Sequence, residues 1–303
     1  MGTTWTRRAA LLLALSISAS GFAGGAFAGA SAQAPGFDCP APATTAAASP
    51  IAITAPASAT PAFPTGEGKL TVFAAASLTD AFAAMATNLE AAHPGLDIVY
   101  NFGGSQMLVT QLSQGAAADV FASANAAQMQ TAIDNGSIVG KPRIFAHNLL
   151  AIVTPAGNPA DIAAPADLGK PGLRLILAQP AVPVGKYARV SICAMGQDTA
   201  TYGEDFVARV AANVVSEEED VRDVLAKVQL GEADAGIVYV SDARAAGDQV
   251  QSIAIPTDVN EIASYPIAVV AEGDAALANA FIGYVLSADG QATLQAFGFE
   301  PAR

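Results

Sequence analysis

The stretch "VFAAASLTDAF", residues 72–82, joins a strand-like run to the start of a helix through three alanines and a serine. The run "KLTVFAA" (69–75) is typical of a buried strand, and apolar residues then recur at helical spacing from Leu78 to Leu89. Such a junction exposes unpaired N–H groups and the positive end of the helix dipole. Ser77 therefore has two interpretations: a donor to a ligand that approaches the backbone closely, or, with Asp80, an ordinary helix cap.

A second junction has the same design. The stretch "YNFGGSQMLVTQL" (100–112) runs from the predicted strand 97–102 through Gly103 and Gly104 into a helix that carries Ser105 in its first turn. Glycine permits close approach of a ligand to the backbone. Both junctions lie at the carboxyl ends of strands, where open α/β sheets bind ligands, and two helix starts suit a small anion.

Short apolar runs alternate with longer amphipathic stretches along the rest of the chain. The further predicted strands are "DVFAS" (119–123), "NLLAIVTP" (148–155), "LRLILA" (173–178), "AGIVYV" (235–240), "VQSIAI" (250–255) and "YPIAVVA" (265–271). Helical stretches separate most of them, which predicts an α/β fold with largely parallel sheets. The length from Lys69 to Arg303 suits two lobes.

The N-terminal part is predicted to direct export. Residues 1–32 contain Arg7 and Arg8, the apolar run "AALLLALSISA" and small-residue cleavage sites, which together indicate a signal peptide. The alternative is a transmembrane helix, but glycines between residues 21 and 25 interrupt the run before the ~20 residues of a span. Residues 33–68 are rich in Pro, Ala, Ser and Thr and are predicted to be a tether. The export route stays open.

The net charge of the chain limits the classes of partner that it can bind. The net charge is −13, and removal of residues 1–32 takes away two arginines and no acidic residue. A surface this acidic repels nucleic acid and anionic lipid. An anion site must therefore depend on local hydrogen-bond donors, because the chain provides no basic field.

Two cysteines, Cys39 and Cys193, occur in a chain predicted to be exported. An oxidising compartment permits a disulfide between them. Cys39 could instead be the acylated residue of a lipoprotein, although "GFDC" lacks the small and aliphatic residues expected before such a cysteine. Both interpretations stay open.

The later half offers three more candidate positions. The stretch "QPAVPVGKYA" (179–188) places Val184 at a helix start, and "GIVYVSDA" (236–243) ends a buried strand with Tyr239, whose hydroxyl needs a partner if buried. In "SEEEDVRDVLAKV" (216–228), a helix opened by a capping box of Ser216 and Glu219 would leave Val221 in its first turn. The acidic residues there are most simply a solvated helix start: Glu217, Glu218, Glu219 and Asp220.

Several motifs in register make the chain resemble the periplasmic molybdate-binding proteins, the solute receptors of ABC-type importers. They are "VFAAASLTDAF", "GGSQMLVTQLSQGAAADVFASAN", "PVGKYA", "EEEDVRDVLAKVQLGEADAGIVYVSDA", "YPIAVV" and "LQAFGFEPA". The resemblance implies a two-lobe type II periplasmic-binding-protein fold, each lobe a mostly parallel sheet flanked by helices. Lobe 1 would comprise residues 69–151 and 266–303, and lobe 2 residues 152–265. The crossing strands would be "LLAIVTP" and "SYPIAVV".

The resemblance also implies a ligand and the residues that bind it. The oxyanion molybdate, or tungstate, would be bound by Ser77 and Ser105 from lobe 1 and by Val184, Val221 and Tyr239 from lobe 2. Val184 stands where the family often has alanine, so a backbone N–H would be its donor, and either neighbour, Pro183 or Gly185, stays open as the true contact. We expect no cofactor, no metal other than molybdenum in molybdate, a monomer, and an ABC permease as partner.

The donor types support the same ligand class independently. Hydroxyl and backbone N–H groups donate without a formal charge, which suits a fully deprotonated tetrahedral dianion. Sulfate stays a competitor. An exported enzyme is the rival class, but the chain has no G-x-S-x-G and no H-E-x-x-H, and its two histidines, His93 and His147, are interpreted as packing or surface residues. A ligand-sensing lobe without transport is the third interpretation.

Overall fold

A computed structural model of the chain describes residues 37–39, 63–64 and 68–302. The predicted signal peptide (1–32) and most of the predicted tether (33–68) lie outside the described residues.

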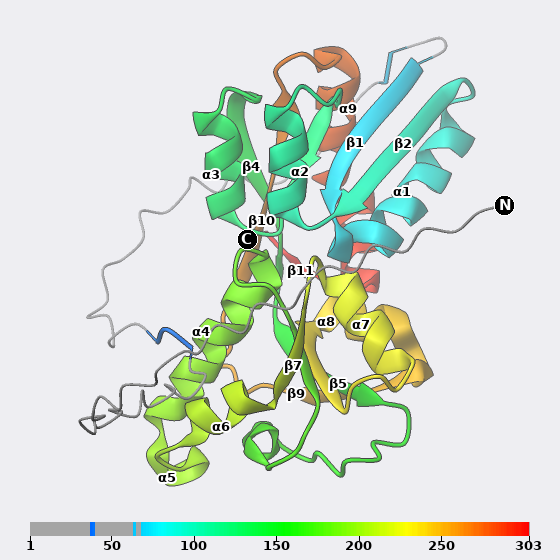
Figure 1. Cartoon of the computed structure of the whole chain (residues 1–303). Coiled ribbons are helices and arrows are strands. Elements are labelled where there is room, and N and C mark those ends of the chain that lie inside the picture. The colour runs from blue at the N-terminus through cyan, green and yellow to red at the C-terminus, as the bar shows by residue number, and fades with distance from the viewer. Residues whose placement is uncertain (1–36, 40–62, 65–67, 303) are drawn as a thin grey trace, which may run out of the picture. The chain divides into compact units, whose positions relative to one another are not determined.

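The first sheet has six strands in the order β11-β4-β10-β3-β1-β2. β1 pairs in parallel with β2 and β3, and β10 pairs antiparallel with β3 and β4. Its strands are β1 (Gly68–Ala75), β2 (Leu96–Gly103), β3 (Val120–Ala122), β4 (Ile138–Asn148), β10 (Ala263–Val270) and β11 (Glu300–Pro301). The helices that accompany it are α1 (Thr79–Ala92), α2 (Ser105–Ser113), α3 (Ala126–Asp134), α9 (Ala275–Val285) and α10 (Ala288–Ala296) (Figure 1).

The second sheet has five strands in the order β7-β6-β8-β5-β9. β6 is parallel to β7 and β8, and β5 is antiparallel to β8 and β9. Its strands are β5 (Leu150–Pro155), β6 (Leu175–Ala178), β7 (Val214–Glu218), β8 (Ala235–Tyr239) and β9 (Val250–Ala254). Its helices are α4 (Pro183–Gln197), α5 (Thr199–Tyr202), α6 (Phe206–Asn213), α7 (Val221–Gln229) and α8 (Val240–Ala246) (Figure 1).

The chain crosses between the sheets twice. β4 ends at Asn148 and β5 begins at Leu150, so the first crossing is at Leu149. The second crossing lies between β9, which ends at Ala254, and β10, which begins at Ala263. The segments "LLAIVTP" and "SYPIAVV" each begin at one of these crossings, as predicted.

Two elements differ from the sequence-based expectation. No strand was predicted at β4, because Gly140 and Pro142 interrupt its apolar pattern; the strand accommodates them with register shifts against β10. The predicted capping box of Ser216 and Glu219 is wrong. Residues 214–218 form β7 at the sheet edge, and the helix begins only at Val221.

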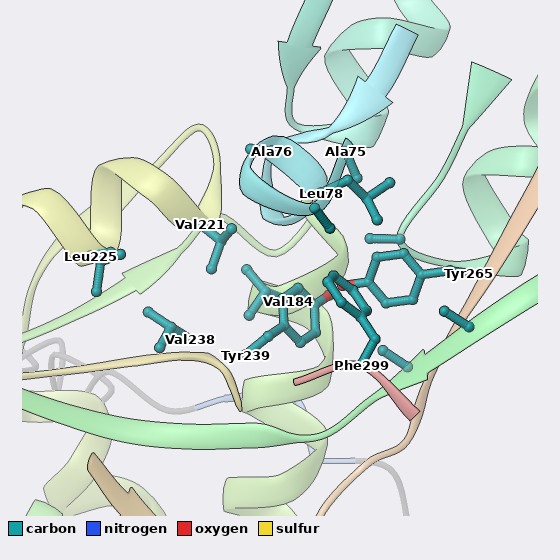
Figure 2. Packing of buried hydrophobic residues seen from close by; sticks show 14 of the residues in the cluster. Ala75, Ala76, Leu78, Val184, Val221, Leu225, Val238, Tyr239, Tyr265 and Phe299 are labelled. Carbon is teal, nitrogen blue, oxygen red and sulfur yellow. The ribbon is translucent and has the colours of Figure 1, made fainter. Parts of the chain in front are cut away.

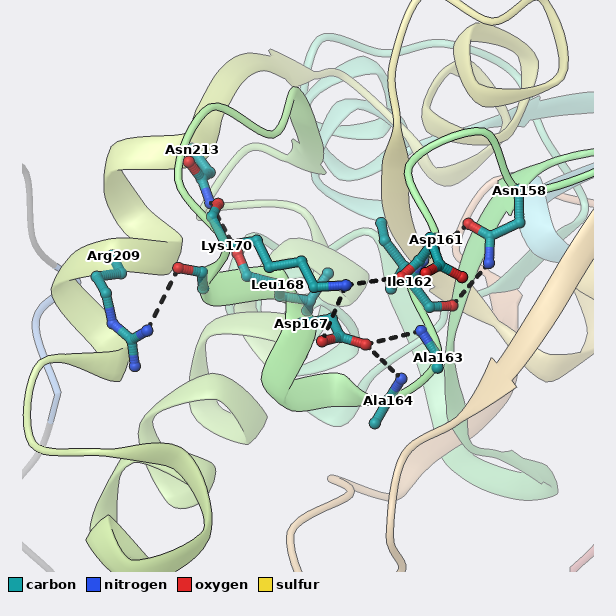
Figure 3. A network of polar contacts seen from close by, with 11 residues as sticks. Asn158, Asp161, Ile162, Ala163, Ala164, Asp167, Leu168, Lys170, Arg209 and Asn213 are labelled. Carbon is teal, nitrogen blue, oxygen red and sulfur yellow. Dashed lines mark hydrogen bonds and ion pairs between the residues drawn. The ribbon is translucent and has the colours of Figure 1, made fainter.

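Polar contacts order the long connection between β5 and β6 (Figure 3). Asp167 Oδ2 accepts hydrogen bonds from the N–H groups of Ala163 (2.7 Å) and Ala164 (3.0 Å). Lys170 Nζ lies 3.2 Å from Asp167 Oδ1 and donates to the carbonyl of Asp161 (2.7 Å). These bonds satisfy backbone groups that have no strand partner in this connection.

The two cysteines form a disulfide. Cys39 is bonded to Cys193 in α4, with the Cα atoms 5.4 Å apart. Phe37 lies beside it, with its ring centre 5.4 Å from the guanidinium carbon of Arg189. The disulfide therefore attaches the start of the described chain to a helix of the second sheet. Because the Cys39 sulfur is engaged in this bond, the lipoprotein interpretation of Cys39 is wrong.

Candidate oxyanion-binding site

All five predicted ligand residues line one small cavity of about 10 Å³. Ser77, Ser105, Val184, Val221 and Tyr239 are each buried. Elements that accompany the first sheet contribute Ala75, Ala76, Ser77, Gly103, Gly104, Ser105 and Ala124. Elements of the second sheet contribute Val182, Pro183, Val184, Asp220, Val221 and Tyr239. The structure thus brings together residues that are far apart in the sequence. Figure 2 shows Val184, Val221 and Tyr239 facing Ala75 and Ala76 across this region.

Ser77 does not cap a helix. It lies in a short 3-10 turn, Ala76–Leu78, and α1 begins after it with no side-chain cap. Its Oγ lies 2.9 Å from the hydroxyl oxygen of Tyr265. The helix-cap alternative for Ser77 is therefore wrong, and its partner Asp80 instead pairs with Arg222 of α7.

Ser105 is the first residue of α2, and Gly104 precedes it as the N-cap residue. Ser105 Oγ accepts a hydrogen bond from the N–H of Ala124 (3.0 Å), so the Ser105 hydroxyl proton is left for another acceptor. Gly104 lies where the two sheets meet. A Cβ atom on it would lie 2.5 Å from the carbonyl oxygen of Glu219, so only glycine permits this approach.

The second sheet contributes the starts of two helices. α4 begins with Pro183, which has no N–H, so its first available donor is the N–H of Val184. α7 begins at Val221, and its N-cap Asp220 accepts from the N–H groups of Arg222 (2.7 Å) and Asp223 (3.1 Å). The cap therefore does not use the Val221 N–H. Both helix starts present backbone donors at the cavity.

Tyr239 is the last residue of β8, and its hydroxyl is buried. No described residue forms a hydrogen bond of normal geometry with this hydroxyl. Burial raises the pKa of Tyr239 well above its ordinary value, so the hydroxyl keeps its proton. A buried donor without a partner carries a free-energy penalty that a ligand acceptor would remove.

Polar contacts join elements of the first sheet to elements of the second beside the cavity. Gln106 Nε2 donates to the carbonyl of Glu219 (2.9 Å), and Gln128 Nε2 donates to the carbonyl of Ala181 (3.3 Å). The ion pair of Asp80 with Arg222 is another such contact. These contacts hold the two halves of the cavity together.

The charges near the cavity are compensated. Arg222 pairs with Asp80 and also, through Nε, with Asp242 Oδ1 at 3.0 Å. Asp242 is fully buried, and burial raises its pKa to about 6 despite the nearby guanidinium. The one ionisable carboxylate among the lining residues, Asp220, is engaged in capping α7. The cavity therefore presents neutral donors.

Residues 70–300 match the family of bacterial extracellular solute-binding proteins. The chain belongs to this family. The solute-binding protein is 42% identical over 241 residues to the molybdate-binding protein ModA of Mycobacterium tuberculosis, an alignment that covers 79% of this chain and 87% of the relative. It is 33% identical over 241 residues to the molybdate-binding protein ModA of Escherichia coli, an alignment that covers 77% of this chain and 89% of the relative.

A solved structure agrees with this membership. The substrate-binding domain of a putative molybdenum ABC transporter from Clostridium difficile is 25% identical, with a TM-score of 0.57 and coverage of 78% of this chain and 99% of that one. The family expected from the sequence and its two-lobe α/β fold class are confirmed. The expectation of mostly parallel sheets is wrong, because β10 and β11 in the first sheet and β5 and β9 in the second run antiparallel to their neighbours. We hereafter use first lobe and second lobe for each sheet with its helices.

The described part of the chain contains neither a metal-binding cluster nor a helix able to span a membrane. Within residues 37–39, 63–64 and 68–302, no group of three His, Cys, Asp or Glu side chains is arranged to hold a metal ion. No helix in the same ranges has the length and apolar character that a membrane span requires. The two histidines lie in packing contacts: His93 against Phe63 (4.8 Å between ring centres) and His147 Nδ1 at 3.0 Å from Ser264 Oγ.

Sequence analysis missed two contributors to the site. Tyr265 and Arg222 occur in the sequence analysis only within longer quoted stretches, "SYPIAVV" and "SEEEDVRDVLAKV", and neither was assigned a role. Each acts through a contact with a residue more than 100 positions away, Tyr265 with Ser77 and Arg222 with Asp80. Such contacts have no local pattern from which they could be predicted.

Proposed function

We propose that this solute-binding protein captures molybdate, and tungstate with it, in the cavity and delivers it to an ABC permease. The observation that carries the proposal is the composition of the cavity wall. Its polar groups are two serine hydroxyls, a buried tyrosine hydroxyl without a partner, and first-turn N–H groups of helices. The names of the relatives described above point to the same ligand.

The donor set favours one protonation state of the ligand. Every group assigned here can donate a hydrogen bond, and a fully deprotonated tetrahedral dianion has only acceptors to offer. Hydrogen phosphate carries a proton that needs an acceptor, and the Asp220 carboxylate is engaged in its cap. The site should therefore reject phosphate, because a buried donor left facing another donor is costly.

The hydrogen-bond donors come from both lobes, so a bound ligand would favour closure of the two lobes. Ser77 and Ser105 belong to the first lobe, and Val184, Val221 and Tyr239 belong to the second. An anion that bridges them binds the closed arrangement better than any open one, so it shifts the population toward closure. The closed form is then the one that a permease would recognise.

The proposal also covers export, the tether, the oligomeric state and the absence of catalysis. Residues 1–32 direct export, residues 33–68 tether the folded part, and the protein acts as a monomer without a cofactor. We propose no enzymatic activity, because the neighbours of the two serines are not bases that could activate a nucleophile: a tyrosine hydroxyl at Ser77 and a backbone N–H at Ser105.

The test is thermal unfolding of the mature protein, dialysed free of oxyanions, with molybdate, tungstate, sulfate or phosphate added separately. At a hundredfold excess over Kd, binding adds ~2.7 kcal/mol, which should raise Tm by about 5–10 °C. We expect shifts with molybdate and tungstate. Equal shifts with sulfate would change the ligand but keep the site, and no shift with any of the four would refute the proposal.

Calorimetric titration of Ser105→Ala locates the site. The substitution removes the hydroxyl that is free to donate, and the Ala124 N–H also loses its acceptor. We expect weaker molybdate binding by a protein that still unfolds cooperatively. An unchanged Kd would argue against this cavity as the binding site.

A further inference from the structure

We propose that Tyr265 is a positioning residue that directs the Ser77 hydroxyl proton toward the ligand and thereby selects fully deprotonated anions. The inference rests on the proposed function and assigns a role to a residue outside the predicted ligand set.

Tyr265 is held in one orientation by aromatic neighbours. It lies in β10, shortly after the second crossing, and its side chain is fully buried. Its ring packs edge-on against Phe145 (6.1 Å between ring centres) and Phe299 (5.4 Å). It also packs against Tyr239, with 5.9 Å between the ring centres and an angle of 66° between the ring planes (Figure 2). Tyr265 thus contacts Ser77 from one half of the cavity and Tyr239 from the other.

The Ser77–Tyr265 pair has two possible hydrogen-bond directions, because either hydroxyl can donate across the 2.9 Å between the oxygens. If Ser77 donates to Tyr265, its proton is used and it can offer the ligand only lone pairs. If Tyr265 donates to Ser77, the Ser77 proton is free for the ligand. A dianion offers only acceptors, so ligand binding requires the second direction.

Tyr265 keeps the proton that it would donate. Burial raises the pKa of its hydroxyl above the ordinary value, although contacts with Ser77, Asn148 and Tyr239 act in the opposite direction. The hydroxyl therefore remains protonated throughout the physiological range. Because the ring is fixed by Phe145 and Phe299, the Tyr265 oxygen stays within hydrogen-bond distance of Ser77 Oγ before a ligand arrives.

The arrangement has a consequence for selectivity. While Tyr265 donates to Ser77, a lone pair of the Ser77 oxygen is occupied, and Ser77 is poorly placed to accept a proton from a protonated anion. Removal of the Tyr265 hydroxyl would free that lone pair. Ser77 could then either donate to a dianion or accept from hydrogen phosphate, so discrimination between the two would fall.

The experiment uses Tyr265→Phe in the full mature chain, which keeps the ring packing and removes one oxygen. Calorimetric titrations with molybdate and with phosphate at pH 7.5 give two affinities for each variant. We expect molybdate to bind about 3–10-fold more weakly, the ratio produced by loss of one hydrogen bond of ordinary net strength. We expect the ratio of molybdate to phosphate affinity to fall by more than the molybdate loss alone.

A double-mutant cycle with Ser77→Ala separates positioning from packing. If Tyr265 acts through Ser77, then Tyr265→Phe causes no further loss of molybdate affinity in the Ser77→Ala background. The matched control is Tyr100→Phe, which removes a hydroxyl that donates to the Phe82 carbonyl (2.8 Å) away from the cavity. The control should bind molybdate as the unmodified protein does.

The outcomes are distinct. Equal losses in both backgrounds, or an unchanged molybdate-to-phosphate ratio, would show that Tyr265 only supports packing and would overturn the inference. Wild-type affinity in Tyr265→Phe would overturn it too. If the unmodified protein binds none of molybdate, tungstate, sulfate or phosphate, the proposed function itself fails, and that result is visible before any Tyr265 variant is made.

Discussion

The ion pair of Asp80 with Arg222 provides a measure of how much the contact between the lobes contributes to ligand affinity. Asp80 is in the first turn of α1, and Arg222 is in the first turn of α7. Arg222 also pairs with the buried Asp242 of α8. Asp80→Asn removes the charge of the cross-lobe partner and leaves the pair within the second lobe intact.

The size of the effect follows from solvent exposure. The side chains of Arg222 and Asp80 are 27% and 40% exposed, so solvent screens the pair and its contribution is about 0.2–1 kcal/mol. If the pair forms only when the lobes are together, that energy is lost from the closed state alone. Molybdate affinity should then fall by a factor of about 1.4–5.

Arg222→Met is a different perturbation, because it leaves buried Asp242 without its cation and should destabilise the fold by about 3–5 kcal/mol.

The assay is calorimetric titration of molybdate at low salt and at 0.5 M NaCl. The control is Asp223→Asn, which neutralises an exposed carboxylate in the first turn of α7. We expect Asp80→Asn to bind more weakly than the control at low salt and the difference to shrink at high salt. Equal affinities of Asp80→Asn and the unmodified protein at low salt would refute the reasoning, as would a loss that salt does not reduce.

Three further predictions concern other parts of the structure. Gly104→Ala would place a Cβ atom 2.5 Å from the Glu219 carbonyl oxygen, so titration should show molybdate affinity at least about tenfold lower, with Tm of the ligand-free protein little changed. Burial raises the pKa of Asp242 to about 6, so the folded state binds more protons than the unfolded state between pH 4 and 6. The free energy of unfolding in urea should therefore fall as pH rises through that window, by up to about 2–3 kcal/mol, and Asp242→Asn should flatten the dependence. Replacement of both Cys39 and Cys193 by serine should lower Tm by roughly 5–15 °C and leave Kd for molybdate unchanged, since the disulfide lies outside the cavity lining.

The strand-to-helix junctions could be predicted because their signals are local. An apolar run, small residues and a change of hydrophobic period occur within a dozen residues of Ser77 and again of Ser105. The elements that were missed lack such signals. β4 contains Gly140 and Pro142, and β7 is an edge strand whose serine and glutamates resemble a helix start.

The remaining features depend on tertiary contacts. The sequence left a helix cap and a ligand donor as alternatives for Ser77. The 3-10 turn Ala76–Leu78, after which α1 begins without a side-chain cap, excludes the first. Likewise, Asp80 fits a capping pattern locally, yet its partner is Arg222 in the other lobe. Local rules predicted where these residues lie along the chain but not what they contact.

A net charge of −13 repels a dianion at long range, and the cavity explains how such a protein could still bind one. The charge of Arg222 is compensated by Asp80 and Asp242, so the cavity uses hydroxyl groups and helix N–H groups in place of a basic field. Short-range hydrogen bonds in a buried site are screened little by salt, whereas long-range repulsion from the acidic surface is screened strongly. Added salt should therefore speed association of molybdate. It should slightly weaken the closed state through the Asp80 pair, so the two effects of salt can be separated by measuring association and dissociation rates independently.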